Sequence, residues 1–585
     1  MERADIEWTD EAAPRSRRFG DVYFSRGGGL EESRAVFLGG CGLPQAWRGR
    51  SRFVVGELGF GTGLNILALL ELWRLQRELG ARLNVFSIEA FPLAREDAVR
   101  ALAGWPELAD LAGPLLASWP AAAGFHRIDL PELGASIEVA VMEAAEALAA
   151  WDGAADAWFL DGFSPSRNPE MWREEVLALI AARSAPGARA ATFTVAGAVR
   201  RGLEAQGFSV AKRPGFGGKA ERLEAVLPEA PARTPRRPPE VCIIGSGVAG
   251  AALARAFRAE GICPIVVEDG HGGASGNPAA LITPRFDAGG GVPARLYAQA
   301  FARAAALYDR ETPEAVIARG VLQLEAAPRD QARFDKVASS DLFAPGALER
   351  LSPEAAGRRL GEPCHSGGLW IPGGLVIEPE PALKAWLADA ERRRGTVAHI
   401  EPTVGGWRVL GPDREIICEA EILCLAAGFG SAALTAGLEL QPVRGQASFA
   451  PAAARPTPAA WGGYVVPTRE GLLFGATHDR GQSDVDVRDD DHRRNLELLA
   501  RARPTLAAEL AQVPLQGRAG VRASTPDRLP LAGELQPGLL VLTGLGGRGF
   551  VLAPLLAEHL AAKALGAPSP LPLALSQALR PDRFS

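Results

Sequence analysis

The sequence predicts a two-domain protein of α/β plus α+β class, and three observations support this expectation. Its 585 residues are too many for one hydrophobic core. A strand, a glycine loop and a helix follow one another in two separate stretches, one near Glu57 and one beginning at Val241. A proline-rich basic segment lies between them and has the composition of a linker. We therefore expect domains over residues 1–228 and 240–585, joined by a linker over 229–239.

The composition is that of an ordinary globular protein, with 47% hydrophobic and 23% charged residues. No run of about twenty apolar residues occurs and the N-terminus is polar, so we expect a cytoplasmic protein with no signal peptide and no membrane anchor. The net charge of -6 does not indicate a nucleic-acid binder, although it says little about local patches. The six cysteines include no CxxC pair, so we expect no metal site and place Cys242, Cys263 and Cys424 in the core.

The first glycine motif follows an apolar strand over 53–58 and opens a helix over 66–79. Glycines allow backbone N–H groups to approach a ligand, and an acid at the end of the next strand, 83–88, is the usual ribose clamp. No Walker lysine follows the loop, which disfavours phosphate binding of the P-loop type. The pattern resembles S-adenosylmethionine-dependent methyltransferases more than a second dinucleotide site. The cofactor-binding candidates are Glu57, Gly59, Gly61, Gly63, Asn65, Glu89 and, after the strand 137–141, Glu143.

A second signal in this half is the strand Asp156–Leu160, which ends in Asp161 and is followed by a polar loop and a helix at Trp172. Ligands bind at the carboxyl ends of strands in open α/β sheets, where Asp161 could orient an amine or accept its proton. A loop-capping aspartate is the alternative.

Beyond the strand 190–195, the loop 211–222 is basic with an aromatic at its centre. It suits a phosphate backbone and a stacked base, or else is a solvated hairpin tip. The RNA-binding candidates are Lys212, Arg213, Phe216 and Lys219.

The stretch Val241–Glu268 shows strand, glycine turn, helix, strand and acid, which is the dinucleotide-binding unit. Its glycines make the turn, let the backbone approach a pyrophosphate and let the helix pack on the strand. The pyrophosphate would lie at the helix N-terminus, with the acid on the ribose hydroxyls. The candidates are Gly245, Gly247, Gly250 and Glu268, with Ser275, Gly276 and Asn277 from a second glycine loop where flavin enzymes wrap the cofactor.

The rest of the chain predicts a mixed domain. Helices are expected at 296–310 and 380–394, and strands at 320–325, 368–372 and 421–428; residues 464–467 and 472–477 indicate a hairpin across a substrate face. The strand 539–543 then leads through a glycine loop into the helix 553–562, whose N–H groups would point at a flavin. Gly546, Gly547, Arg548 and Gly549 belong to this loop. Arg522 and Arg548 are candidates for bidentate binding of a substrate carboxylate, although surface arginines are common in this chain.

Together these motifs resemble the MnmC family of bifunctional tRNA 5-methylaminomethyl-2-thiouridine biosynthesis proteins. DVYFS, ELGFGTGLN, LDGFSPSRNPEMW and KRPGFGGKAE are similar to the methyltransferase half. IIGSGVAGAALA, GASGNPAALITPR, GRAGVRASTPDRLPLAG and GLGGRGF are similar to the flavoprotein half, of D-amino-acid-oxidase or glycine-oxidase type. Gly547, Ser164 and Ser166 are modest departures. The resemblance implies an N-terminal Rossmann-like methyltransferase fold and a C-terminal FAD-binding Rossmann domain with an antiparallel-sheet substrate domain.

The resemblance also implies two reactions on the wobble uridine of a tRNA anticodon loop. With FAD, the C-terminal half would remove the carboxymethyl group of 5-carboxymethylaminomethyl-(2-thio)uridine as glyoxylate. With S-adenosylmethionine, the N-terminal half would methylate the resulting amine, which Asp161 would hold or deprotonate. Arg522 aligns with the carboxylate-binding arginine of glycine oxidases, and Tyr464 falls where they have a carboxylate-side tyrosine.

The catalytic candidates are therefore Asp161, Arg522, Tyr464 and Arg548, and Phe163, Trp172 or Phe216 could stack on the base. We expect tRNA as the partner of a monomeric protein.

Two alternatives share the motifs. A glycine or D-amino-acid oxidase fused to a small-molecule amine methyltransferase would leave the basic loop and linker unexplained. A tRNA-binding scaffold with decayed sites is disfavoured by the intact Glu57, Glu89, Asp161, Glu268 and Arg522.

Overall fold

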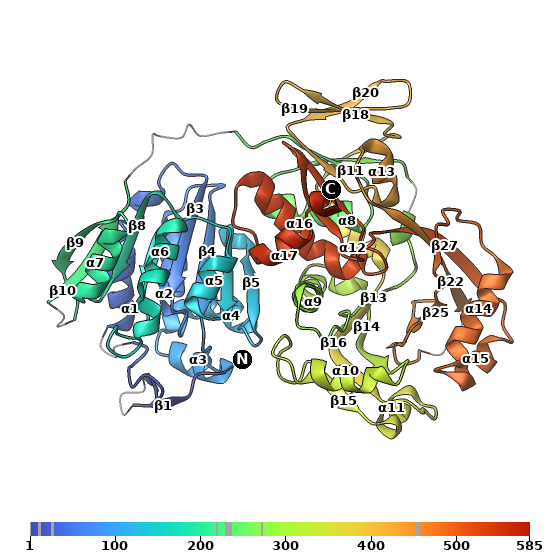
Figure 1. The fold of residues 1–585 in the computed structure, drawn as a ribbon, viewed down its shortest axis with the longest axis horizontal. Helices are drawn as coiled ribbons and strands as arrows, with labels where there is room; N and C mark the ends of the chain where they lie inside the picture. Colours follow the sequence, from blue (N-terminus) through green and yellow to red (C-terminus); the bar gives the residue numbers. More distant parts are fainter. Residues whose placement is uncertain are drawn as a thin grey trace. The chain divides into compact units, whose positions relative to one another are not determined.

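The structure, a computed structural model, describes residues 2–9, 13–24, 28–217, 220–228, 237–270, 273–451 and 455–584 (Figure 1). The chain divides into two compact units. Unit 1 comprises Met1–Arg237 with Gly566–Leu573, and unit 2 comprises Pro238–Leu565 with Ala574–Ser585. Most of the predicted linker 229–239 lies outside the described residues.

Unit 1 is built on an eight-stranded sheet in the order β5-β6-β4-β3-β7-β8-β10-β9. Its centre consists of parallel pairs between β3 (Arg52–Leu58), β4 (Arg82–Glu89), β6 (Ala135–Val141) and β7 (Ala155–Leu160). Because parallel strands present their carboxyl ends at one edge, the residues that end β3, β4 and β7 meet there. α2 (Leu64–Gln76) follows β3 directly, as the glycine motif predicts.

Both faces of this central sheet are covered. Val54, Leu58 and Phe86 belong to one hydrophobic cluster and Val55 and Val85 to another, as expected for alternating residues of a sheet buried on both sides. The other elements of unit 1 are β1 (Ile6–Trp8), β2 (Pro14–Ser16), α1 (Gly29–Glu32), a π-helix (Ser33–Leu38), α3 (Arg95–Leu102), α4 (Ala109–Ala117), β5 (Gly124–Leu130), α5 (Ala144–Ala150), α6 (Glu174–Ala182), β8 (Ser184–Thr192), α7 (Gly197–Ala205), β9 (Ser209–Pro214) and β10 (Glu221–Val226).

Unit 2 contains a six-stranded sheet in the order β17-β12-β11-β21-β29-β28. The predicted dinucleotide unit forms its centre, because β11 pairs in parallel with both β12 and β21. The bounds are β11 (Val241–Ile244), α8 (Val248–Ala259), β12 (Ile265–Glu268), β17 (Glu391–Arg394), β21 (Ile422–Leu425), β28 (Leu531–Gln536), β29 (Leu539–Thr543) and α16 (Gly549–Leu565).

Unit 2 also contains a ten-stranded sheet. Its long strand β22 (Gln441–Pro451) pairs antiparallel with β25 (Gly471–Gly475) and β27 (Gln516–Ser524), and β25 pairs with β24 (Tyr464–Pro467). The last pairing confirms the predicted hairpin.

α14 (Asp489–Ala500) and α15 (Pro504–Leu510) cover one face of this sheet, where Ala450 and Phe474 pack with Leu499 and Leu506. The remaining elements of unit 2 are β13 (Ala280–Ile282), α9 (Val292–Glu311), β14 (Val316–Leu324), α10 (Arg329–Ala338), β15 (Glu349–Leu351), α11 (Pro353–Leu360), β16 (Gly368–Ile377), α12 (Pro379–Leu387), β18 (His399–Thr403), β19 (Gly406–Leu410), β20 (Ile416–Ala420), α13 (Ser431–Leu434), β23 (Ala459–Ala460), β26 (Asp479–Arg480) and α17 (Leu573–Ala578).

Two local predictions are wrong. The helix expected over 380–394 ends at Leu387, and 391–394 form strand β17 instead, because this segment pairs in parallel with β12 and Arg392 bonds Glu268. Cys263 is exposed in the loop before β12, whereas Cys242 and Cys424 are buried in strands as expected. No helix in the described part of the chain is both long and apolar enough to cross a membrane.

Candidate active sites

A cavity of about 540 Å³ opens at the carboxyl edge of the parallel strands of unit 1. The glycine loop after β3, the end of β4 and the loop after β7 all contribute to its wall. The predicted residues that line it are Gly59, Gly61, Asn65, Glu89, Glu143 and Asp161. The fold thus brings together side chains that lie about a hundred residues apart in the sequence.

The glycine loop has the backbone conformation that its composition predicts. Gly59, Gly61 and Gly63 have φ angles of 81°, 54° and 79°, a region that favours glycine. A Cβ atom on Gly59 would lie 3.2 Å from the Cα of Gly162, so the loop approaches the segment after β7 closely. Gly63 caps α2 and is not part of the cavity wall.

Glu89 is held at the cavity by backbone donors. The N–H groups of Gly61 and Phe91 each donate to its carboxylate at 2.9 Å. Burial raises the pKa of Glu89 to about 7, and these two N–H groups act in the opposite direction. Its carboxylate can therefore exchange a proton near neutral pH.

Asp161 is oriented by its neighbours. The Nδ2 of Asn65 donates to one of its oxygens at 2.8 Å, and the N–H of Gly162 donates to the other at 2.8 Å. The hydroxyl of Ser33 donates to the Oδ1 of Asn65 at 2.6 Å, which fixes the amide in the orientation that presents Nδ2 to Asp161. This chain of bonds sets the direction of the carboxylate at the cavity wall.

Glu57 does not lie where the sequence interpretation put it. Its side chain is fully buried behind the glycine loop and accepts a hydrogen bond from Ser87, the residue opposite it on β4. Burial raises the pKa of Glu57 well above its ordinary value. Its carboxylate is therefore enclosed between β3 and β4, while the cavity wall is formed by other residues.

Aromatic side chains from the N-terminal segment complete this cavity, and the sequence analysis missed their role. Phe163 stacks on Phe19 with ring centroids 4.8 Å apart, and Tyr23 meets its edge at 5.2 Å. All three line the cavity. The motif DVYFS contains Tyr23 and was a signal for this segment, whereas Phe19 lies before the motif. Trp172, by contrast, is buried and donates its indole N–H to the carbonyl of Phe163, so it is not a stacking surface.

The basic loop 211–222 is a β9–β10 hairpin whose described cations already face carboxylates. Lys212 pairs with Glu221 at 2.7 Å, and Arg213 lies 3.6 Å from Glu224. Phe216 packs against the hydrophobic core of unit 1, which corrects the expectation of a free stacking ring. Lys219 lies outside the described residues.

In unit 2 a cavity of about 850 Å³ opens at the N-terminus of α8. Gly245 and Gly250 shape this end without lining it. A Cβ on Gly250 would lie 1.7 Å from the carbonyl oxygen of Gly245, and Gly245 has a φ of 105°. They are the close-packing and turn glycines that the motif predicts. The lining residues include Gly247, Glu268, Ser275, Gly276, Asn277 and Arg518.

Polar contacts hold the second glycine loop beside this cavity. The hydroxyl of Ser275 accepts from the N–H of Val248 at 3.0 Å, and Arg518 on β27 donates to Asn277 at 3.0 Å. Glu268 forms an ion pair with Arg392, and this bond lowers the pKa of Glu268. Sequence analysis missed Arg518, which stands four residues before Arg522 in the same strand.

Arg522 and Tyr464 lie on one face of the ten-stranded sheet. Arg522 is opposite Val443 of β22, and Tyr464 is opposite Gly475, which in turn is opposite Ala447 of β22. Residues opposite one another, or two apart, share a face. Neither side chain lines the 850 Å³ cavity.

The guanidinium of Arg522 lies over Gly445. A Cβ on Gly445 would lie 2.4 Å from the Nη1 of Arg522, so only glycine leaves this space. Burial lowers the pKa of Arg522 and raises that of Tyr464. No described carboxylate pairs with Arg522, whose Nη1 donates to the carbonyl of Thr477 at 3.4 Å.

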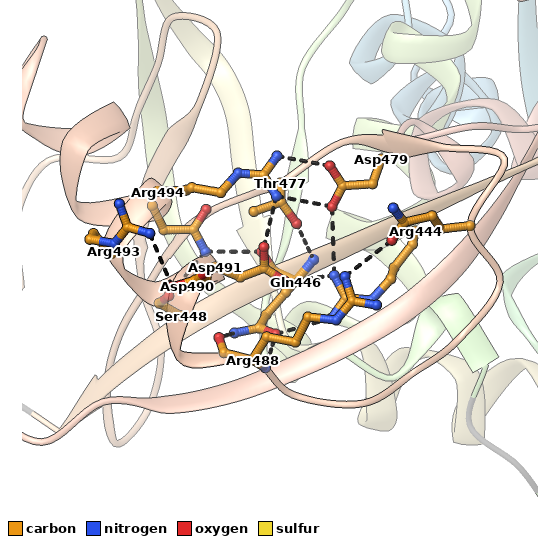
Figure 2. Close-up of polar contacts among 12 residues, drawn as sticks. Arg444, Gln446, Ser448, Thr477, Asp479, Arg488, Asp490, Asp491, Arg493 and Arg494 are labelled. Atoms are coloured by element: carbon orange, nitrogen blue, oxygen red, sulfur yellow. Dashed lines mark hydrogen bonds and ion pairs between the residues drawn. The ribbon is translucent and has the colours of Figure 1, made fainter.

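The opposite face of β22 carries a buried charge network (Figure 2). Arg444 is fully buried and donates to Asp491 at 2.6 Å and to Asp484 at 3.0 Å. The backbone N–H of Gln446 donates to the hydroxyl of Thr477 at 2.9 Å. The network therefore supports the segment whose carbonyl accepts from Arg522.

Arg548 and its glycine loop stand at the start of α16. The Nη1 of Arg548 donates to the carbonyl and the hydroxyl of Thr283, at 2.6 Å and 2.8 Å. One end of the guanidinium is thus bound by the protein, and binding of a carboxylate by its other nitrogens stays a prediction. Gly546 has a φ of 55°, whereas Gly547 and Gly549 show no positive φ.

Comparison with known proteins agrees with this geometry. Residues 240–563 match the family of FAD dependent oxidoreductases, and residues 106–228 match S-adenosyl-L-methionine-dependent methyltransferases. Glycine oxidase from Geobacillus kaustophilus shares the fold of the FAD-dependent oxidoreductase region, with 23% identity, a TM-score of 0.52 and coverage of 59% of this chain and 98% of that one. No cluster of three or more metal-ligating side chains occurs in the described ranges.

Two relatives that match this chain over nearly its full length have the same name. The tRNA 5-methylaminomethyl-2-thiouridine biosynthesis bifunctional protein MnmC of Caulobacter sp. (strain K31) is 58% identical over 99% of this chain and 97% of its own. The protein of that name from Maricaulis maris (strain MCS10) is 42% identical over 100% of this chain and 96% of its own. With its methyltransferase and FAD-dependent oxidoreductase regions in the same chain, the protein belongs to the MnmC family of bifunctional tRNA-modifying enzymes.

Proposed function

We propose that this protein performs two successive reactions on the wobble uridine of tRNA. Unit 2 removes the carboxymethyl group of 5-carboxymethylaminomethyl-(2-thio)uridine, and unit 1 methylates the 5-aminomethyl product to 5-methylaminomethyl-(2-thio)uridine. When bound at the α8 cavity, FAD would supply the hydride acceptor for the first reaction, and S-adenosylmethionine bound at the unit 1 cavity would supply the methyl group for the second. We further propose that the protein acts as a cytoplasmic monomer.

The residues present fit these two ligands. In unit 2 the N-terminus of α8, with Gly247 at the cavity wall, offers N–H groups and a positive dipole end to a pyrophosphate. Glu268 lies at the same cavity, in position for ribose hydroxyls. In unit 1 the loop Gly59–Gly63 provides a close backbone approach, and Glu89 provides a carboxylate for the ribose.

In the first reaction Arg522 would bind the carboxylate of the substrate. A guanidinium matches a carboxylate with two parallel hydrogen bonds, and burial strengthens such a pair. Tyr464, on the same face of the sheet, would orient the carboxylate from the side. Loss of a hydride from the methylene carbon of the carboxymethyl group and of the proton on nitrogen would give an imine of the substrate, which water would cleave to the free amine and glyoxylate.

In the second reaction Asp161 would hold the amine of the aminomethyl group and accept its proton. The amine needs a free electron pair to attack the methyl carbon, so a carboxylate in a fixed direction serves as base and as positioning group. Phe163, with Phe19 and Tyr23, provides apolar faces at the same cavity for the uracil ring.

One observation carries the proposal. The match to this chain extends over 97% of the MnmC protein of Caulobacter sp. (strain K31) and 96% of that of Maricaulis maris, so both halves of these relatives are present here. The test is nucleoside mass spectrometry on tRNA from cells that lack this activity. Incubation with protein and S-adenosylmethionine should convert the carboxymethylaminomethyl form into the methylaminomethyl form. Accumulation of the aminomethyl form would disprove the second step, and oxidation of free glycine without any change in tRNA would disprove the substrate assignment.

A further inference from the structure

Three basic residues cluster at one end of β22 in unit 2. Arg480 on β26 and Arg522 on β27 are both opposite Val443, one on each side of β22, so their side chains leave the same face of the sheet. The turn after β27 contains Arg528, and the adjoining Ser524 is opposite Gln441, the first residue of β22.

Arg480 and Arg528 are exposed, and no described residue forms an ion pair or hydrogen bond with either guanidinium. The acids beside them in the sequence are bound elsewhere. Asp479 bonds Arg494 at 2.8 Å, and Asp527 bonds Arg583 at 2.8 Å. The two guanidinium groups therefore face solvent with their positive charge uncompensated by these neighbours.

The side chain of His478 interacts electrostatically with all three arginines. Burial, followed by the charges of Arg522, Arg480 and Arg528, lowers the pKa of His478. The positive charge of this cluster comes from its arginines. Such a field attracts anions over a distance of about one Debye length, roughly 10 Å at 0.1 M salt.

We propose that Arg480 and Arg528 form a binding site for the phosphates that flank the target uridine in tRNA. The inference rests on the proposed function and adds to it the residues by which unit 2 recognises RNA. Arg522, on the same face, would bind the carboxylate of the modified base, while the two exposed arginines bind the backbone on either side. Guanidinium groups bind phosphate oxygens in pairs, which fixes the orientation of the strand.

This site differs in kind from the hairpin of unit 1 that the sequence suggested. Lys212 and Arg213 have carboxylates within 4 Å, and their binding to RNA would require those pairs to open. Arg480 and Arg528 need no such rearrangement. An anticodon loop is single-stranded, so its phosphates can follow a surface that presents two separated cations.

The test uses the full-length, FAD-loaded protein and measures only the first reaction, with S-adenosylmethionine omitted. The variant is R480A/R528A, and the matched control is R329A/R501A, which removes two exposed arginines at the ends of α10 and α14. The substrates are tRNA that contains 5-carboxymethylaminomethyluridine and the same modified uridine as a free nucleoside.

We expect KM for tRNA to rise roughly tenfold in R480A/R528A, with kcat within about twofold of wild type. The slope of log(kcat/KM) against log[salt] should become shallower by about 1.4, since each lost phosphate contact on a single strand contributes about 0.7. Turnover of the nucleoside and the flavin absorbance should stay at wild-type levels, and the control variant should match wild type throughout.

An unchanged KM and salt slope for tRNA in R480A/R528A would overturn the proposal. So would an equal loss with the nucleoside, because the arginines would then act on the base and its carboxylate. If wild-type protein converts the nucleoside and leaves tRNA unchanged, the proposed function fails, and that result is independent of any variant.

Discussion

The two units gather their candidate residues in opposite ways. In unit 1 the glycine loop, Glu89 and Asp161 all follow parallel strands of one sheet and line one cavity. In unit 2 the dinucleotide motif belongs to the six-stranded sheet, whereas Arg522 and Tyr464 come from antiparallel strands of the ten-stranded sheet.

The charges of the two sites also differ in sign. The wall of the unit 1 cavity contains eight acidic residues, among them Glu89, Glu143 and Asp161, and four arginines, so acids are in excess. The face of the ten-stranded sheet that we propose binds substrate carries Arg522 and Arg518. Each sign matches the group to be handled: a sulfonium and an amine in unit 1, and a carboxylate in unit 2. One substrate nucleotide can thus be processed by two sites of opposite charge. The group removed in the first step bears a carboxylate, whereas the product of that step bears an amine.

The largest expected effect comes from R522A. Loss of the buried guanidinium leaves the substrate carboxylate unpaired, which costs about 4 kcal/mol, or roughly a thousandfold in kcat/KM of the first reaction. Methyl transfer to tRNA that already carries the aminomethyl group should be unaffected. Nucleoside mass spectrometry measures both rates. An equal fall in methyl transfer would contradict the assignment of the two reactions to different units.

D161N should affect the other half alone. An amide cannot accept the proton of the amine, so methyl transfer should fall by roughly a hundredfold or more. Removal of the carboxymethyl group should stay within about twofold of wild type. S-adenosylmethionine binding, measured by calorimetry, serves as the control for an intact cavity. Methyl transfer at the wild-type rate would show that Asp161 is a structural residue.

G445A tests the geometry of Arg522 without changing that residue. The new Cβ would lie 2.4 Å from Nη1, so the guanidinium must move, and kcat/KM of the first reaction should fall roughly tenfold. G462A is the matched control, because a Cβ there meets no atom within 4 Å. Equal activity of the two variants would mean that Arg522 tolerates displacement.

The smallest expected effect is a pH dependence in unit 1. The pKa of Glu89 is raised to about 7, and ribose hydroxyls donate to its ionised form. Affinity for S-adenosylmethionine should therefore increase several-fold as pH rises from 6 to 8 and level off above that. E89Q should bind more weakly and lose this dependence, as titration calorimetry can show. A wild-type affinity independent of pH would exclude Glu89 as a ribose ligand.

Local patterns predicted much of the fold, since each glycine motif contains its strand, turn and helix within about thirty residues. What failed depended on distant partners. The segment 391–394 has helical character in the sequence, yet it adds to β12 because the neighbouring strand offers a ladder and Glu268 offers a partner for Arg392.

The candidate sites show the same limit. Asp161 was identifiable because it ends an apolar strand, whereas the fixed amide of Asn65 and the stacking of Phe19 on Phe163 depend on contacts across more than ninety residues. The sequence also did not show which aromatic side chains are exposed. Trp172 and Phe216 are in polar loops, yet both pack against the hydrophobic core.

The structure of strand β22 limits which mutations this protein can tolerate during evolution. Its alternate residues serve two different tasks: Val443 and Gly445 border Arg522, while Arg444 and Gln446 join the buried network. A substitution changes one task at a time. An insertion or deletion of one codon within the strand would exchange the two faces, placing Arg444 beside the substrate and glycine over Asp491. We therefore expect homologous sequences to differ in β22 by substitutions and not by insertions or deletions.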